Sequence, residues 1–212
     1  RWKEDGRNRQ VKNLFEVKFV HGLVARRNLL VNNWSSAQDG KAVLLHYTTN
    51  GPCPHCGGLR DVVLEDNVIL NSPGGISFQG YSYQASHRSG EKLLRATVRN
   101  NYFVLTGAGS HRAIAIGNVL GRHDIRIERN TILHEASTWL VGDFGYGWKD
   151  DTVVRGGPMQ GLWVIDNVVT RNGRYGITAP SGSHYGEGVG PDGQDPKRGP
   201  FVSGDLAIAG AG

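Results

Sequence analysis

Long hydrophobic runs are missing from this chain of 212 residues. No stretch of about 18 apolar residues occurs, which excludes a transmembrane helix. The chain opens with the charged residues Arg1 to Arg9, so it shows no signal peptide either. Lysine and arginine total 24, yet they form no run of about five, which argues against a nucleic-acid-binding protein. The net charge of +5 favours an acidic partner, and an anionic polysaccharide fits it.

Methionine occurs once and cysteine twice, whereas glycine occurs 31 times. Many glycines without long apolar periodic segments argue against a helical protein. Cys53 and Cys56 form a C-x-x-C sequence within the Gly/Pro-rich segment from Thr49 to Gly58. We favour a disulfide that pins this loop. A zinc site would need two ligands beyond the nearby His55, and redox catalysis would need a helix N-terminus inside a βαβ unit.

One phrase recurs along the chain: an apolar residue, a polar or charged pair, asparagine, any residue, and an apolar residue. The spacings between its asparagines are 39, 34, 29 and 37 residues. Asparagine suits a sharp corner between strands because it tolerates left-handed backbone geometry, and its amide can bond the equivalent residue one coil away. We therefore assign a structural ladder to five residues: Asn28, Asn67, Asn101, Asn130 and Asn167.

Short strand-like runs stand between these phrases, among them Val43–Leu45, Ile76–Phe78 and Ala113–Ile116. Two or more short strands per repeat, with Gly and Asn at the corners, are typical of a coiled β-ribbon whose turns pair in parallel. The sequence therefore predicts an all-β fold, a parallel β-helix (β-solenoid) of about five to six coils with loop insertions. A single domain over residues 1–212 is expected.

The phrase resembles the coil signature of the pectate-lyase-like right-handed parallel β-helix superfamily. A bacterial secreted β-helix repeat family of unassigned activity is also similar, at Lys12–Lys18, Asn32–Trp34 and Ala37–Gly40, and again at Asn167–Val169 and Tyr175–Ile177. These matches extend from about Trp2 to about Ile177. The resemblance implies a right-handed winding and a secreted or cell-surface location. Family members continue for further coils, so the chain is expected to be a fragment of a longer one.

In β-helix lyases and hydrolases the substrate lies along the outside of a parallel sheet. Alternation along Val11 to Phe19 turns Phe15, Val17 and Phe19 inward. The same rule predicts the outward-facing residues of this and the following coils: Lys12, Glu16, Lys18, His46, Ser77 and Gln79. Stacked coils lie about 4.8 Å apart, so these side chains could form one carbohydrate-binding patch, with Lys12 and Gln79 as substrate contacts.

Glu16 to Lys18 followed by Asn28 is loosely similar to a pattern in alginate lyases and chondroitinase B. The similarity implies β-elimination, with Lys18 as the base, His46 as a second proton carrier and Glu16 as a ligand of calcium. The sequence departs from the pattern around Asn13, where a glutamate is replaced, and no Arg-His pair follows. The alternative is a solvated face whose surface ion pairs contribute little.

The second candidate site is the insertion from Thr138 to Met159. Its aromatic residues can stack on sugar rings, and its carboxylates can serve as acid and base when about 5–9.5 Å apart. The aromatic candidates are Trp139, Tyr146 and Trp148, and the acidic candidates are Asp143, Asp150 and Asp151. The alternative is an ordinary loop that packs its aromatic side chains onto the coil.

Two functions follow. The first is a secreted β-helix protein that binds an acidic polysaccharide and, if it is an enzyme, cleaves it as a polysaccharide lyase or glycoside hydrolase. The second is a non-catalytic protein that binds glycan or builds a fibre. In that case its coils associate end to end, because the open ends of a solenoid are exposed sheet edges. The sequence leaves open whether the protein is an enzyme.

Overall fold

The computed structural model describes residues 12–33, 41–46, 58–79, 94–106, 111–117, 122–134, 138–144, 146–149, 152–155, 160–171, 177–178, 201–202 and 207–210. All regular elements in these ranges are β-strands. Within the same ranges, no helix has the length and apolar character that crossing a membrane requires.

The strands form three sheets, each six-stranded, here named A, B and C. Sheet A contains β1 (Asn13–Val17), β4 (Lys41–His46), β7 (Ile76–Gln79), β10 (His111–Gly117), β13 (Thr138–Phe144) and β18 (Ile177–Thr178). Sheet B contains β2 (Val20–Arg26), β5 (Leu59–Glu65), β8 (Leu94–Arg99), β11 (Arg122–Glu128), β16 (Gln160–Ile165) and β19 (Phe201–Val202). Sheet C contains β3 (Leu29–Val31), β6 (Val68–Ser72), β9 (Tyr102–Leu105), β12 (Thr131–His134), β17 (Val168–Arg171) and β20 (Ala207–Gly210).

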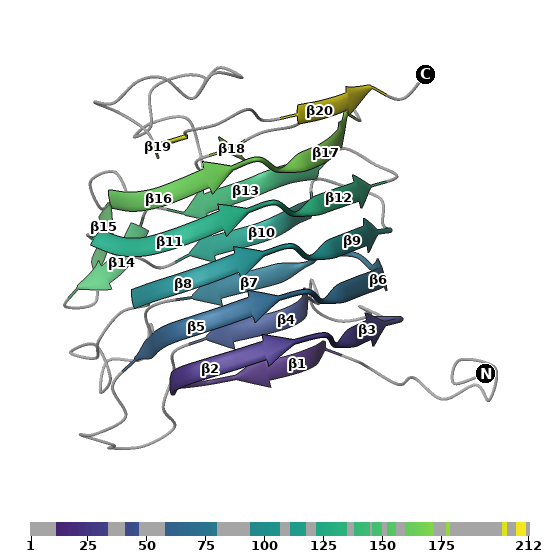
Figure 1. Ribbon diagram of the computed structural model, residues 1–212. Coiled ribbons are helices and arrows are strands. Elements are labelled where there is room, and N and C mark those ends of the chain that lie inside the picture. The colour runs from purple at the N-terminus through teal and green to yellow at the C-terminus, as the bar shows by residue number, and fades with distance from the viewer. Residues whose placement is uncertain are drawn as a thin grey trace, which may run out of the picture.

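The chain passes through sheets A, B and C in turn and then returns to sheet A one strand further along the stack (Figure 1). Every pairing within the three sheets is parallel, as between β1 and β4 or between β2 and β5. Parallel strands cannot be joined by tight hairpins, so each coil must travel around the axis before it pairs with the previous one. The predicted all-β class and solenoid architecture are confirmed.

One expectation about the corner between sheets B and C was wrong, namely which residue there has left-handed backbone geometry. The sequence assigns left-handed geometry to the ladder asparagine, but the residue before it has the positive φ angle. These residues, with φ between 50° and 57°, are Arg27, Asp66, Asn100, Arg129 and Asp166. Left-handed backbone turns the chain, so the asparagine that follows can direct its side chain inward. Asn101, Asn130 and Asn167 are accordingly no more than 2% exposed.

The inward asparagines form a continuous ladder. The side-chain Nδ2 of Asn28 donates to Oδ1 of Asn67 at 2.9 Å, and that of Asn67 donates to Oδ1 of Asn101 at 2.9 Å. Asn101 repeats this bond to Asn130 at 3.0 Å, and Asn130 repeats it to Asn167 at 2.9 Å. Each donor residue also gives its backbone N–H to the same oxygen, as from Asn28 to Asn67 at 3.0 Å. Buried polar groups need such partners, so the ladder fixes the register of successive coils.

Apolar columns fill the interior. In sheet A, Val43, Ile76 and Ile114 stand in register, and each is at most 4% exposed. Sheet B has a similar register column, in which each residue is at most 2% exposed: Leu64, Val98, Ile127 and Val164. Full burial of such a side chain contributes about 1.5–3 kcal/mol. The narrow core between the three sheets is therefore the main source of stability.

Two expectations about the strands were wrong. Phe19 does not join Phe15 and Val17 in the core; its side chain is 49% exposed. β1 ends at Val17 and the chain bends, so alternation cannot be extended to residue 19. The predicted insertion from Thr138 also begins inside the stack, because Thr138–Phe144 is β13 of sheet A. The part that leaves the stack is an antiparallel hairpin of β14 (Tyr146–Lys149) and β15 (Thr152–Arg155).

Candidate functional site

Polar residues from the first two strands of sheet A gather at the N-terminal edge of the stack. β1 carries Glu16, the bend after it carries Lys18, and Lys12 comes just before the strand. β4 ends at His46, one residue past the pairing of Val17 with Leu45. We name Lys12, Glu16, Lys18 and His46 the edge cluster. The structure thus brings together four of the residues that the sequence places on the outer face.

Glu16 is held by its neighbours within the edge cluster. Its Oε1 forms an ion pair with Nζ of Lys18, and its Oε2 accepts a hydrogen bond of 2.7 Å from Nδ2 of Asn13. Oδ1 of Asn13 in turn accepts a bond of 3.4 Å from the backbone N–H of Lys41 in the next coil. The sequence gives Asn13 no role, because residues three apart on an ideal strand face opposite sides. Asn13 therefore positions Glu16 and links it to β4.

His46 is neutral at physiological pH. The pKa of His46 is lowered to about 4, first by burial and then by the positive charges of Lys18 and Lys12, while the carboxylate of Glu16 opposes this shift. Its Nε2 is enclosed and has no hydrogen-bond partner among the residues that the structure describes. Burial on its own would raise the pKa of Glu16, but hydrogen bonds from Lys18 and Asn13 and the charges of both lysines lower it overall. At pH 7 the cluster thus holds a carboxylate, two cationic side chains and a neutral imidazole.

Calcium does not fit this cluster. Ca²⁺ takes about six to eight oxygen ligands. Glu16 contributes a single carboxylate, and both of its oxygens are already bonded to Lys18 and Asn13. Within the part of the chain that the structure describes, no group of three His, Cys, Asp or Glu residues could hold a metal ion.

Along the described side chains of β4, β7 and β10, the register column of Glu16 is buried. Glu16 is in register with Leu44, Ser77 and Ala115. These three residues are only 7%, 3% and 5% exposed, respectively. Ser77 alternates with the core residues Ile76 and Phe78 and so belongs to the outer face of the strand, but its burial means that a bound chain could not reach it. Gln79 pairs in register with His46, but its side chain lies outside the described part.

The second candidate site is divided between elements. Trp139 and Asp143 lie on β13, whereas Tyr146 and Trp148 lie on β14, and none of these side chains is described. Asp143 occupies a register position opposite Ile116, in a column that is apolar in the preceding coils. Several predicted residues fall outside the described part altogether: Asp150, Asp151, Cys53 and Cys56.

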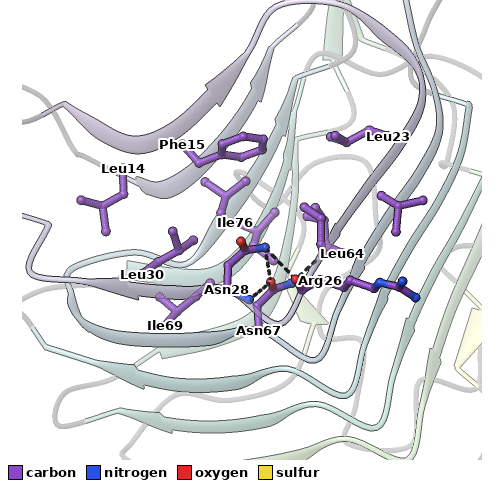
Figure 2. A pocket seen from close by; sticks show the side chains of 13 residues that line it. Leu14, Phe15, Leu23, Arg26, Asn28, Leu30, Leu64, Asn67, Ile69 and Ile76 are labelled. Carbon is purple, nitrogen blue, oxygen red and sulfur yellow. Dashed lines mark hydrogen bonds between the residues drawn. The ribbon is translucent and has the colours of Figure 1, made fainter.

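An open cavity of about 370 Å³ lies at the same end of the stack as the edge cluster. Its walls are inner side chains of the first coil, such as Phe15, Leu23 and Leu30, together with Ile76 from a later coil (Figure 2). Asn28 and Asn67 border it with their hydrogen-bonded amides. The sequence did not identify this cavity, because it exists only where the stack of coils ends.

Comparison of the chain with protein-family models, with curated proteins and with solved structures returned no match. The edge cluster must therefore be interpreted from its own chemistry.

Proposed function

We propose that this protein binds an acidic polysaccharide at the edge cluster. The grouping of Lys12, Lys18 and neutral His46 around a single carboxylate carries the proposal. The ammonium groups of Lys12, which is exposed, and of Lys18, which is partly exposed, can pair with carboxylate or sulfate groups of a polymer. The proposal also includes a secreted or cell-surface location.

The fold part of the proposal is a right-handed parallel β-helix of about five to six coils, related to the pectate-lyase-like superfamily. The coil phrase and the parallel stacking of three sheets support it. In such an arrangement a linear polymer can lie across the stacked strands, so successive sugars meet successive coils.

Cleavage by β-elimination is the enzymatic form of the proposal. A base must take the proton next to a uronate carboxylate while cations neutralise the developing negative charge. A carbon–carbon double bond then forms as the bond from the neighbouring carbon to the glycosidic oxygen breaks, and that departing oxygen takes a proton from water. Lys18 is already paired with Glu16, so His46 suits the base better, with Lys12 and Lys18 as charge partners. The imidazole ring would have to turn, because Nε2 is enclosed.

The binding test compares alginate and polygalacturonate with the neutral polymer dextran by isothermal titration calorimetry. We expect binding to the two acidic polymers only, and about a tenfold loss of affinity in the double variant Lys12→Gln/Lys18→Gln. Arg95→Gln/Arg99→Gln is the matched control, because it also removes two exposed positive charges, here from β8 of sheet B, away from the cluster. Equal losses in both variants would show that binding follows net charge and not this site.

Turnover is tested separately, by release of an unsaturated product that absorbs in the ultraviolet. If the protein is a lyase, His46→Gln should abolish product release and preserve binding. Binding without turnover would favour the second candidate function, a non-catalytic glycan-binding or structural protein. The burial of Leu44, Ser77 and Ala115 supports this alternative, since these outer positions of β4, β7 and β10 offer a polymer no exposed polar side chain.

A further inference from the structure

The outer face of sheet C is uncharged and largely aliphatic. Side chains that alternate with the core point outward, as Tyr102 and Val104 do on either side of the buried Phe103. Tyr102 is 40% exposed and Leu29 is 65% exposed. The face consists of two register columns, whose residues are all exposed or partly exposed: Leu29, Val68, Tyr102, Thr131 and Val168, and beside them Val31, Leu70, Val104 and Leu133. Contiguous apolar patches of this kind mark interaction sites.

A column of polar residues borders this face at the corner between sheets B and C, where β3, β6, β9, β12 and β17 begin (Figure 1). Its members are the left-handed residues that precede the ladder asparagines, in coil order Arg27, Asp66, Asn100, Arg129 and Asp166. Asp66 is partly exposed and the other four are exposed. Their charges run positive, negative, neutral, positive, negative. Read in reverse, this order has the opposite charge at every charged position.

A column that is complementary to its own reverse suits a two-fold contact. A two-fold axis that lies across the face, parallel to β9, reverses the order of the coils and keeps the direction of the strands. Arg27 would then lie opposite Asp166 of a second copy. In the same way Asp66 would lie opposite Arg129 of the second copy, and Asn100 would meet the other Asn100. Two-fold contacts are reciprocal, so each ion pair would form twice.

The charges also select where the axis lies. Moving it by half a coil would bring Arg27 against Arg129 in one direction, or Asp66 against Asp166 in the other. Moving it by a whole coil would bring Asp66 against Asp66 or Arg129 against Arg129. Like charges that face each other oppose association, so the five described corner residues favour an axis at the coil of β9.

We propose that the outer face of sheet C binds a second copy of this chain, with its stack of coils running in the opposite direction, in a two-fold dimer centred on Tyr102. The apolar columns agree with this axis, because Tyr102 would lie against Tyr102, and Leu70 would lie opposite Leu133. Two sheets packed face to face lie about 10 Å apart. The patch is only two columns wide, so we expect a weak dimer that dissociates at about 10–100 μM.

A charge swap tests the dimer, measured by sedimentation velocity of the whole chain over a range of concentrations. Arg27→Asp and Asp166→Arg each place like charges across the interface, and each should weaken dimerisation about tenfold. The corner already carries both residue types in other coils, so neither variant strains the backbone. The double variant Arg27→Asp/Asp166→Arg should restore dimerisation to within about threefold of the original. Within one chain these residues are four coils apart, about 19 Å, so restoration requires a contact between copies.

Two further variants make the test specific. Arg126→Glu is the matched control, because it changes the net charge as much as Arg27→Asp does but lies on the outer face of sheet B, and it should leave dimerisation unchanged. Tyr102→Lys should weaken dimerisation, because it puts two ammonium groups at the centre of the contact. Tyr102 belongs to the third coil, so its effect separates this lateral contact from end-to-end association. Circular dichroism checks that each variant is folded.

Three results would overturn the proposal. The first is a chain that stays monomeric up to about 300 μM, which would leave the face to a different partner. The second is a dimer that the charge swap does not restore, or that Arg126→Glu weakens as much as Arg27→Asp does. The third is an assembly that Tyr102→Lys leaves unchanged, which would place the contact elsewhere on the molecule.

Discussion

Oδ1 of Asn130 accepts two hydrogen bonds from Asn101, one from the backbone N–H and one from the side-chain Nδ2, both 3.0 Å long. Both residues are at most 2% exposed, so water cannot replace either bond. Nδ2 of Asn101 also donates to the carbonyl oxygen of Leu64 at 2.9 Å. A single amide therefore joins three consecutive coils at the corner between sheets B and C.

Asn101→Ala should lower the free energy of unfolding by about 3 kcal/mol, because it leaves buried donors of Asn67 without their acceptor. Asn28→Ala is the matched control at the exposed end of the ladder, where we expect a loss of about 1 kcal/mol or less. Urea denaturation followed by circular dichroism measures both. Equal losses would mean that the ladder contributes no more inside the stack than at its end.

Gly75→Ala should destabilise the protein by about 2–3 kcal/mol, because a Cβ at Gly75 would collide with the backbone oxygen of Ala113 and approach the ring of Phe103 to 3.0 Å. Gly74→Ala is the control. A Cβ at Gly74 would meet only the flexible end of the Lys41 side chain, so its cost should stay below about 1 kcal/mol. The two variants differ by one position, and thermal unfolding should separate them clearly.

Asn100 has a φ of 52°, which glycine adopts without strain and a β-branched residue does not. Asn100→Gly and Asn100→Val both lose the bond to Asp66, so their difference isolates the backbone effect. We expect the valine variant to be less stable than the glycine variant by about 1–2 kcal/mol. Similar melting temperatures for the two variants would contradict a left-handed residue at this corner.

Stability should fall as the pH is lowered from about 6.5 to about 4. The pKa of His46 is lowered to about 4 in the native protein, so the unfolded chain takes up its proton first and acid favours unfolding over this interval. The pKa of Glu16 is also lowered in the native protein. Its protonation therefore destabilises the native state as well, at pH values below its usual pKa of 4.5. His46→Gln should flatten the upper part of the profile, measured as melting temperature against pH, and an unchanged slope would rule His46 out as its source.

Repetition made the architecture predictable. Each corner repeats the same phrase, so the asparagines and the strands on either side could be located without coordinates. The left-handed residue was misassigned because both members of the pair at each corner are polar, as with Arg27 and Asn28. Only the backbone φ angles show which residue of each pair adopts the left-handed conformation. Phe19 was misplaced because alternation holds within a strand and the sequence gives no clear end to β1.

The edge cluster was predictable in part. Alternation grouped Lys12, Glu16 and Lys18, since they belong to one short segment. It could not show that Ser77 is buried or that Asn13 bonds Glu16, because both depend on neighbouring coils. The unequal spacings of 39, 34, 29 and 37 residues also conceal which charged residues stand in register, such as Arg99 and Glu65.

The sequence by itself determined that short strands wind in parallel around an apolar core with asparagines at one corner, because those features depend on local pattern and repetition. The tertiary structure alone decided which side chains meet across coils. It placed His46 beside two lysines and formed a cavity lined by side chains from several coils. Such relations depend on three-dimensional register, and insertions of unequal length separate the interacting residues along the chain.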